Sequence, residues 1–347
     1  MEPTRPTRAA AAFERRVRRA LGDAGVASDE PLVVACSGGA DSSATLLAVA
    51  RTHAQPRLVT AAYFDHGWRV RAETAADCAA VSALAQRAGA RSVDGLAEPG
   101  ATRGEAAARR ARYGWLAAAC RAAGARVCVT GHTQDDQAET VILRLTRGSG
   151  LSGVAGMAPL SRWPVSGGGG LRVARPLLGE PRDAVNAYLD AMGETARHDA
   201  SNELLDLARN RVRRRVIPEL RALNPRASQA IAAFADRARA DAATLDALAA
   251  ERAQGRVRVE GGGVHVQRAW LRAQPRAIAA RVVLQAAAAV GLTISGAQLE
   301  AVLRAAPRRG ATVQLRGGRV RMHADAAVIE RHAGLPDTAP ADAPADD

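Results

Sequence analysis

The chain has 347 residues, which exceeds one average domain and favours two. Its formal net charge is +13 and its sequence pI is about 11.1, and this surplus favours a polyanionic partner, nucleic acid above all. All 48 basic residues are arginine, so the chain excludes Walker-type kinases and Schiff-base enzymes, which need a lysine. A genome that replaces lysine with arginine would explain the choice of residue but not the excess of positive charge.

No C-x-x-C spacing occurs among the four cysteines, which stand in apolar or alanine-rich segments at Cys36, Cys78, Cys120 and Cys128. This pattern predicts small buried thiols in a reducing compartment. The arginine-rich stretch 5–19 contains Glu14 and lacks a cleavage pattern, which favours an amphipathic helix over a transit peptide. No uninterrupted apolar run approaches membrane-spanning length, and we expect a cytoplasmic protein with no membrane partner.

The stretch from Leu32 to Leu47 combines an apolar run, a glycine turn and a helical pattern. It predicts a strand, a phosphate-binding loop and a helix. The loop consists of Ser37, Gly38, Gly39, Ala40, Asp41 and Ser42. Its glycines let backbone N–H groups approach an anion, and its serines add hydroxyl donors. Asp41 would repel phosphate unless a divalent cation lay between them, which implies Mg²⁺. The alternative is an ordinary strand-to-helix turn, and the chain carries neither a Walker A loop nor a G-x-G-x-x-G fingerprint.

Strands and helices alternate along the first half of the chain. Besides the strand before the glycine loop, the pattern predicts helices over 9–24, 72–88 and 104–123, and strands over 57–64, near 93 and over 126–130. This alternation predicts parallel βαβ units, whose ligand sites gather at the carboxyl ends of the strands. Asp65 and His66 stand at such an end, although Asp65 also suits a plain turn.

A second polar cluster follows the strand predicted over 126–130. Thr133 suits a helix N-cap, and acids in the first turn complement the helix dipole. Capping accounts for one acid, whereas this segment carries His132, Asp135, Asp136 and Glu139. Beside a phosphate loop, these side chains are suited to hold Mg²⁺ or the amine of a cationic substrate.

Arginines recur in two helical segments. Arg109 and Arg112 lie on the helix predicted over 104–123, where a solvated face explains them as well as a functional one. The denser cluster between 209 and 215, which includes Arg209 and Arg211, suits a phosphate backbone.

Two glycine-rich tracts, 147–153 and 167–170, predict loops. The first suits a lid beside a site, and the second a flexible surface excursion. Further along, the pattern predicts helix over 181–192 and over 218–253, a hairpin over 257–266, two helices near 275–306, and strands over 312–315 and 320–323. The tail, 334–347, is rich in proline, alanine and aspartate and is expected to be disordered.

Taken in order, these motifs resemble the bacterial tRNA(Ile)-lysidine synthetases, which are N-type ATP pyrophosphatases of the PP-loop superfamily. The resemblance covers residues 30 to about 220 and rests on the 37–42 loop, Asp65-His66-Gly67, the helix from Glu105 to Tyr113, the segment from Asp135 to Thr140, Arg147-Gly148-Ser149-Gly150, Asp199 with Ser201 and Asn202, and Arg209-Asn210-Arg211. Trp68, Thr133 and Ala200 depart from the usual pattern beside these motifs.

The resemblance implies an α/β fold: a parallel-sheet, Rossmann-like N-type ATP pyrophosphatase domain over 1–217, a helical connection over 218–255 and a smaller, mostly helical α+β tRNA-binding domain over 256–333. It also implies the reaction, in which cytidine 34 of the CAU anticodon of tRNA(Ile) is adenylated by ATP and free L-lysine then displaces AMP. The implied partners are that tRNA and lysine. A homodimer is compatible with the sequence, which does not determine the oligomeric state.

The resemblance suggests a role for each group of residues. The 37–42 loop would bind the pyrophosphate of ATP, Asp41 and Asp136 would hold Mg²⁺, and His132 with Asp135 or Glu139 would face the substrate; Asp41, His132 and Asp136 form the expected catalytic set. Contacts with substrate or tRNA are expected from Asp65, His66, Arg109, Arg112, Arg147, Arg209 and Arg211.

Three other functions share some of these features. A tRNA thiolase of the same superfamily would need cysteines placed to carry sulfur or a cluster, which the cysteine pattern does not favour. Asparagine, GMP and NAD synthetases share the loop, but no amidotransferase domain is recognisable here. A catalytically dead RNA-binding protein would not need Asp41, Asp135 and Asp136.

Overall fold

The computed structural model describes residues 7–68, 71–98, 104–195 and 208–332. The chain forms two compact units. The first contains the described residues up to Leu143 together with Gly156–Ala233, and the second contains Arg144–Ala155 and the described chain from Phe234 onward. Asp199, Ser201, Asn202 and the tail predicted to be disordered lie outside the described residues.

A six-stranded sheet forms the centre of the first unit, in the order β3-β2-β1-β4-β6-β5. Its strands are β1 (Leu32–Ala35), β2 (Val59–Asp65), β3 (Arg91–Leu96), β4 (Val127–Val129), β5 (Leu160–Arg162) and β6 (Arg172–Ala174). Every neighbouring pair is parallel except β5 with β6. The predicted parallel α/β architecture is therefore confirmed.

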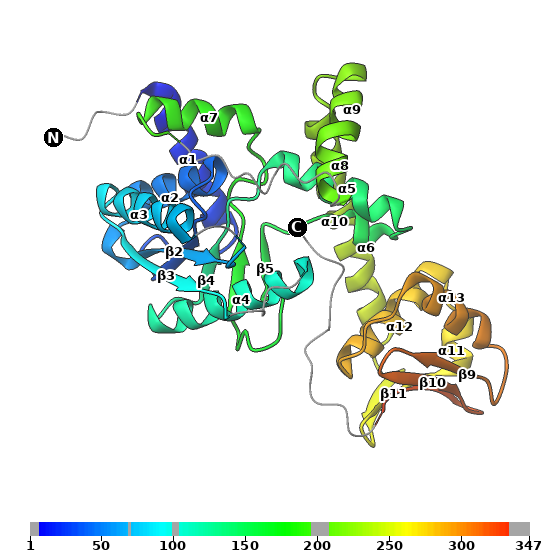
Figure 1. The fold of residues 1–347 in the computed structure, drawn as a ribbon. Helices are drawn as coiled ribbons and strands as arrows, with labels where there is room; N and C mark the ends of the chain where they lie inside the picture. The colour runs from blue at the N-terminus through cyan, green and yellow to red at the C-terminus, as the bar shows by residue number, and fades with distance from the viewer. Residues whose placement is uncertain (1–6, 69–70, 99–103, 196–207, 333–347) are drawn as a thin grey trace. The chain divides into compact units, whose positions relative to one another are not determined.

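Helices cover both faces of this sheet (Figure 1). One face carries α1 (Arg8–Asp23), α2 (Ala40–Thr52), α3 (Arg71–Arg87) and α7 (Arg182–Ala191), and the other carries α4 (Glu105–Ala122). The alternation of strand side chains explains the two cores: Leu32 and Val34 of β1 pack with the first group, whereas Val33 packs with Tyr113 and Leu116 of α4. All three β1 side chains are fully buried, as expected for a central parallel strand.

The remaining helical segments up to residue 252 belong partly to the first unit and partly to the second. They are a 3₁₀ turn (Pro56–Leu58), α5 (Gln134–Thr146), α6 (Leu151–Val154), α8 (Ala208–Arg211), a π-helical turn (Val212–Val216), α9 (Ile217–Leu223) and α10 (Ala227–Arg252). α5 begins directly after β4, so its first turn lies at the carboxyl edge of the sheet, next to the loop that follows β1.

The helix α1 is fixed to α7 and α2 by a buried polar cluster. Phe13 stacks on Tyr188 with ring centroids 4.5 Å apart. Glu14 accepts hydrogen bonds from Arg51 Nε at 2.6 Å and from the Tyr188 hydroxyl at 3.0 Å. Burial, and then the charge on Glu14, raise the pKa of Tyr188 well above its usual range, so the phenol remains a donor. The amphipathic helix expected at the start of the chain is thus an integral part of the first unit.

The antiparallel pair β5–β6 was not predicted, because both strands have only three residues. The glycine tract 167–170, expected to be a flexible excursion, connects these strands. A Cβ at Gly168 would lie 2.4 Å from Cβ of Trp163, so the tract packs closely against that indole. Glycine at 168 is required by this close approach.

The second unit contains an antiparallel sheet in the order β7-β8-β11-β10-β9. Its elements are β7 (Val257–Glu260), β8 (Gly263–Gln267), α11 (Arg268–Ala273), α12 (Arg276–Ala289), α13 (Gly296–Ala305), β9 (Thr312–Leu315), β10 (Gly318–Met322) and β11 (Ala326–Arg331). The sequence predicted the hairpin β7–β8, two of these helices and the pair β9–β10, but missed α11 and β11. The missed strand β11 lies between β8 and β10 and joins the two hairpins into one sheet.

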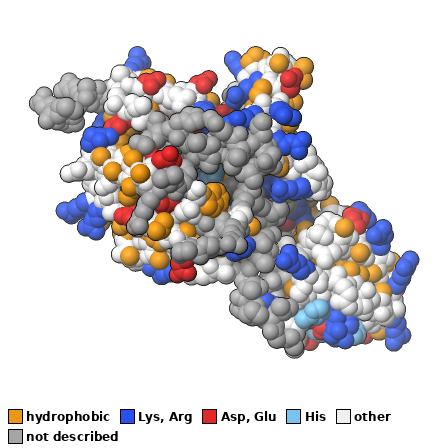
Figure 2. All heavy atoms as spheres, viewed as in Figure 1, with side chains coloured by type: hydrophobic (Ala, Val, Ile, Leu, Met, Phe, Trp, Pro, Cys, Tyr) orange, Lys and Arg blue, Asp and Glu red, His pale blue; other side chains and the backbone are white. Residues whose placement is uncertain are grey.

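The positive charge of the chain is spread over its surface. On the face shown in Figure 2, blue arginine side chains are widespread and red acidic side chains are sparser. Within the described ranges, none of the helices combines the length and the hydropathy that crossing a bilayer requires.

Replacing Phe13 with alanine tests the α1–α7 contact. Phe13 is 2% exposed and stacked, so Phe13→Ala should lower the free energy of unfolding of the first unit by about 3 kcal/mol or more. Urea denaturation followed by tryptophan fluorescence measures this loss. The comparison substitution Phe234→Ala, in the second unit, removes a ring that is 42% exposed and should cost far less. Equal losses in the two variants would contradict the packing described here.

Candidate active site

The loop between β1 and α2 is shaped to bind an anion. Gly38 has a φ of +87°, which an L side chain rarely adopts, and Gly39 precedes the first residue of α2 without any side-chain cap. The N–H groups of the first turn of α2 therefore have no capping side chain and, with the helix dipole, favour a negatively charged ligand. The predicted strand, loop and helix are all present.

Ser42 closes the same loop from within. Its Oγ donates to the carbonyl of Gly39 at 3.0 Å and accepts from the N–H of Ser37 at 3.2 Å, while the two hydroxyl oxygens lie 3.3 Å apart. Ser37 is exposed at the mouth of the loop. One serine thus holds the backbone conformation, and the other presents its hydroxyl to a ligand.

The end of β4 approaches the first turn of α2 closely at Gly131. A Cβ on Gly131 would lie 2.7 Å from the carbonyl oxygen of Asp41 and 2.9 Å from Oγ1 of Thr45. Thr45 donates its hydroxyl to that same Asp41 carbonyl at 2.7 Å. Only a residue without a side chain fits here, so Gly131 brings the second predicted cluster beside the phosphate loop.

Asp136 is the best-satisfied acid of this second cluster. One carboxylate oxygen accepts from the N–H of Thr133 at 2.7 Å and from its hydroxyl at 2.9 Å, so Asp136 caps the start of α5. The other oxygen accepts from Arg209 Nη2 and Arg213 Nη2, each at 3.0 Å. Thr133, expected to be the capping acceptor, is instead the donor to Asp136.

The two arginines that reach Asp136 also bind Glu139. Arg209 Nε donates to Glu139 at 2.8 Å, and Arg213 Nε donates to it at 2.6 Å. Glu139 is 1% exposed, so this network of two carboxylates and two guanidinium groups is buried. Buried charges of one sign persist only beside charges of the other, and the cluster is balanced.

The pKa of Asp136 reflects this balance. Burial raises the pKa, but Arg209, His132, the N–H of Thr133 and Arg213 together lower it to about 2. Asp136 is therefore ionised at neutral pH, and His132 is near enough for its charge to act on it. His132 itself shares a 2.8 Å hydrogen bond between Nδ1 and Oγ1 of Thr130.

Asp41 has a different environment. Its Oδ2 accepts from Arg182 Nη2 at 2.8 Å, whereas its Oδ1 is buried and has no hydrogen-bond partner among the described residues. Burial raises the pKa of Asp41, the charge of Arg182 lowers it, and the charge of Asp136 raises it. The charges of Asp41 and Asp136 therefore act on each other, and Oδ1 of Asp41 lacks a hydrogen-bond partner among the described residues.

Other predicted residues occupy distinct surroundings. Asp135 is buried and accepts a hydrogen bond at 2.5 Å from Nη2 of Arg221, whose side chain is more exposed. Asp65 accepts from the N–H of Gly67 at 2.8 Å, which is the geometry of a turn, and His66 stacks against Trp68 with centroids 5.1 Å apart. These residues end β2, at the same edge of the sheet as the phosphate loop.

The predicted arginines divide into three groups. Arg109 and Arg112 lie over the ring of Tyr113, at 4.9 and 5.4 Å from its centroid. Arg209 is paired with acids, as described, while Arg211 is exposed. Arg147 is exposed and belongs to the second unit. The structure therefore brings together the 37–42 loop, His132, Asp136, Glu139 and Arg209.

Two arginines of the site, Arg182 and Arg221, were missed at the sequence level, and Arg213 was placed in the cluster between 209 and 215 without its carboxylate partners. Arg213 follows Arg209 by four residues, and this helical spacing could have placed both on one face. Arg182 and Arg221 carried no such signal, because their partners Asp41 and Asp135 are far away in the sequence.

A family model for the PP-loop domain matches residues 9–220. A tRNA(Ile)-lysidine synthase of Salinispora arenicola is 43% identical to the chain over 267 residues, covering 74% of this chain and 75% of that protein. Another, of Methylobacterium sp. (strain 4-46), is 37% identical over 334 residues, covering 88% and 92%. The chain belongs to the tRNA(Ile)-lysidine synthase family. The resemblance of its motifs to that family is thus confirmed.

A solved structure shares the fold. It is a U34-tRNA thiolase, NcsA, from Methanococcus maripaludis, with a TM-score of 0.52 and 16% sequence identity, covering 65% of this chain and 78% of that one. The cysteines of the present chain differ in character from reactive thiols. Cys36, Cys120 and Cys128 are buried, and burial raises the pKa of Cys36. A hydrogen bond with Cys120, followed by burial, raises the pKa of Cys128, so the Cys36 and Cys128 thiols both favour the protonated, less reactive form.

The close approach at Gly131 predicts the effect of one added methyl group. Gly131→Ala should separate α2 from β4, weaken binding of ATP, and lower the free energy of unfolding by about 1–3 kcal/mol. Calorimetric titration with a non-hydrolysable ATP analogue and urea denaturation measure the two effects. The control Gly114→Ala lies on α4, where nothing approaches the added Cβ within 4 Å, and it should bind ATP as the wild type does. Normal ATP affinity in Gly131→Ala would contradict the assignment.

The low pKa of Asp136 predicts acid sensitivity. Its folded value of about 2 lies below the ordinary 3.8, so this contribution to stability is present above about pH 4 and is lost as the pH falls through 2. The gap between the two values corresponds to about 2 kcal/mol. The free energy of unfolding, measured by urea from pH 5 downward, should therefore fall more steeply in the wild type than in Asp136→Asn.

The variant Asp23→Asn serves as the control for this acid titration. Asp23 is exposed at the end of α1 and should leave the steep wild-type pH dependence unchanged. If Asp136→Asn kept the wild-type steepness, Asp136 would not be the ionised, arginine-paired group described here.

Proposed function

We propose that this enzyme uses ATP and free L-lysine to convert cytidine 34 of the CAU anticodon of tRNA(Ile) into lysidine, releasing AMP and diphosphate. The observation that carries the proposal is the junction at Gly131, where an anion-binding loop directly adjoins a buried cluster of carboxylates. ATP presents the anion, and lysine presents the cation. No lysine residue of the chain competes for the second role, because the chain contains none.

The first step forms an adenylate. The C2 oxygen of cytidine attacks the α-phosphorus of ATP, a new P–O bond forms, the bond between the α and β phosphates breaks, and diphosphate leaves with the bonding electrons. The N–H groups at the start of α2 and the hydroxyl of Ser37 are placed to hold that developing negative charge. Arg182, which is bound to Asp41 in this structure, adds a positive charge beside the start of α2.

Magnesium fits this site at Asp41. Mg²⁺ is usually held by one or two carboxylates together with the phosphates of the substrate, and Asp41 Oδ1 is a buried oxygen without a partner among the described residues. Asp136 could contribute a second oxygen only by giving up a contact with arginine or Thr133. When bound, the ion would neutralise phosphate charge.

The second step joins lysine. The amine nitrogen attacks C2, the C2–O bond breaks, and AMP leaves, while the amine loses a proton. We assign acceptance of that proton to His132, which lies beside Asp136 and can use one ring nitrogen while Nδ1 contacts Thr130. Glu139 and Asp136 are assigned to the ammonium group of lysine, which would replace one guanidinium contact of the buried network. Asp135, which is bound to the half-exposed Arg221, is assigned to the approach of the substrate.

The tRNA contacts remain proposals for Arg109, Arg112, Arg147 and Arg211, together with Asp65 and His66 at the end of β2. His66 and Trp68 present stacked rings, and Trp68 is 56% exposed. The four cysteines are free thiols, which supports a reducing, cytoplasmic setting. The thiolase alternative is less favoured, because burial raises the pKa of the Cys36 thiol, and a hydrogen bond with Cys120 together with burial raises that of Cys128, which makes both less reactive.

Asp41→Asn tests the proposal. It keeps the size of the side chain but removes the charge that would hold the metal, so AMP release from ATP in the presence of tRNA(Ile) and lysine should fall by at least about 100-fold. The affinity for tRNA should be nearly unchanged. Mass analysis of the tRNA after incubation with labelled lysine measures the product directly.

Asp29→Asn is the matched control, because Asp29 is exposed on the same unit and should retain wild-type activity. Release of ADP in place of AMP by the wild type, or tRNA that gains no lysine at saturating ATP, would overturn the proposed function. Wild-type turnover by Asp41→Asn would overturn the metal assignment alone.

A further inference from the structure

The helix α1 presents a face of arginine that the proposed reaction does not use. Its inner face is buried through Ala10, Phe13, Glu14, Val17 and Leu21. On the remaining surface, Arg8, Arg15, Arg18 and Arg19 are all exposed. We call these four residues the arginine face. From Arg8 to Arg19 the helix rises about 16 Å, a length that spans several phosphates of a nucleic-acid strand.

The arginine face carries uncompensated charge. Glu14, on the same helix, is buried and bound to Arg51 and Tyr188. Arg16 donates two hydrogen bonds to the carboxylate of Glu180, from Nε at 2.6 Å and from Nη2 at 2.8 Å. The four residues of the arginine face have no ion-pair or hydrogen-bond partner for their side chains among the described residues. Exposed arginines without acidic partners are typical of surfaces that bind phosphate.

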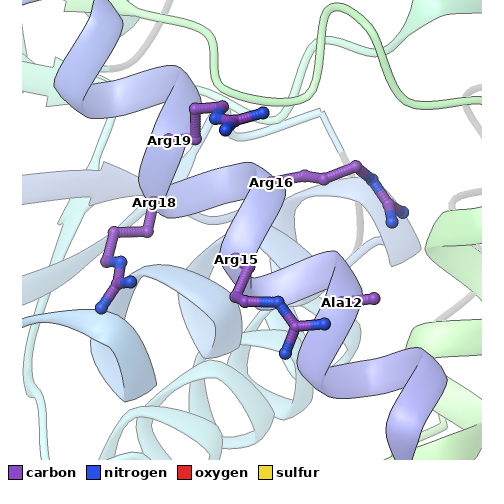
Figure 3. Close-up of a pocket in the computed structure, with 5 residues that line it drawn as sticks. All are labelled: Ala12, Arg15, Arg16, Arg18 and Arg19. Atoms are coloured by element: carbon purple, nitrogen blue, oxygen red, sulfur yellow. The ribbon is translucent and has the colours of Figure 1, made fainter.

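Arginine side chains from successive turns of α1 stand around an open hollow on the surface of the helix. Arg15, Arg16, Arg18 and Arg19 line a hollow of about 490 Å³ around the small side chain of Ala12. In Figure 3 these arginines extend outward from the helix, and their guanidinium groups are separate from one another. A surface of this kind accepts several oxyanions at once rather than one small ligand.

The arginine face is joined to the active site through Arg16. Its partner Glu180 precedes α7, and the carbonyl of Glu180 accepts from the N–H of Gln134, the first residue of α5, at 3.1 Å. Two residues beyond Glu180, Arg182 binds Asp41. The helix α1 therefore borders the same edge of the first unit where a nucleotide would enter. A polynucleotide with one base in that site would carry its neighbouring phosphates past α1.

We propose that Arg8, Arg15, Arg18 and Arg19 bind phosphates of the RNA strand next to the nucleotide held in the active site. The inference rests on the proposed function, because it takes the RNA to be the substrate. A membrane surface is the weaker alternative: amphipathic helices insert an exposed apolar face, whereas the apolar face of α1 is buried within the protein. No large exposed apolar residue of the described chain lies on α1.

The test replaces three of these arginines with glutamine in the full chain, Arg15→Gln with Arg18→Gln and Arg19→Gln. Binding of an unmodified tRNA(Ile) transcript is measured by fluorescence anisotropy over a range of salt concentrations. The slope of log K against log salt should decrease in magnitude by about 2, since each lost phosphate contact on a single strand contributes about 0.7.

A matched control removes the same charge from the opposite edge of the sheet. Arg57, Arg91 and Arg126 are exposed and stand at the amino-terminal ends of β2, β3 and β4. Their triple replacement by glutamine should leave the salt slope within experimental error of the wild type. A second variant, with Arg15, Arg18 and Arg19 all changed to lysine, keeps the charge and should restore most of the slope. That variant separates loss of phosphate contacts from loss of folding.

Two results would overturn the inference. One is a salt slope equal to that of the wild type in the glutamine variant; the other is an equal loss in the control variant. Binding of the wild type to anionic phospholipid vesicles through the same three arginines, with tRNA binding unaffected, would also overturn it in favour of a membrane surface. If the wild type binds the transcript without modifying it, the proposed function is wrong. The salt dependence of binding would still test the arginine face in that case.

Discussion

The close approach of β4 to α2 at Gly131 is the constraint on which the site depends. Because Gly131 has no side chain, the backbone of Asp41 can lie against the end of β4, and the first turn of α5 follows directly. The N-terminus of α2, which is suited to bind an anion, and the N-terminus of α5, which carries carboxylates, therefore lie side by side at one edge of the sheet. In the proposed reaction, release of diphosphate and attack by the amine would both need the N-termini of α2 and α5 to be close together.

The site is also organised by how its charges are balanced. Asp136 and Glu139 are buried, and both are paired with Arg209 and Arg213. This pairing contributes to the low pKa of Asp136. Asp41 is matched on one oxygen only, and burial raises its pKa. The less satisfied oxygen of Asp41 is the point where an added cation gains most.

The large positive charge of the chain is used in two different ways. Inside the first unit, arginines from α8, the following π-helical turn and α9 neutralise the acids of α5. On the outer surface of α1, Arg8, Arg15, Arg18 and Arg19 have no acidic partner among the described residues, which leaves their positive charge available to a polyanion. Replacing lysine by arginine suits both uses, since the planar guanidinium group binds carboxylates and phosphates in pairs of hydrogen bonds.

The sequence by itself determined the alternating strands and helices of the first unit, the phosphate loop and the acids after β4, because each has a local signature of hydrophobic period, glycine or capping residue. It missed β5, β6 and β11, which are short or adopt their conformation only by pairing with distant strands. Only the tertiary structure decided that Asp136 is held by Arg209 and Arg213, that Arg182 binds Asp41, and that α1 borders the site. Such ion pairs join residues 70 or more positions apart, and no local pattern in a single sequence encodes a contact across that distance.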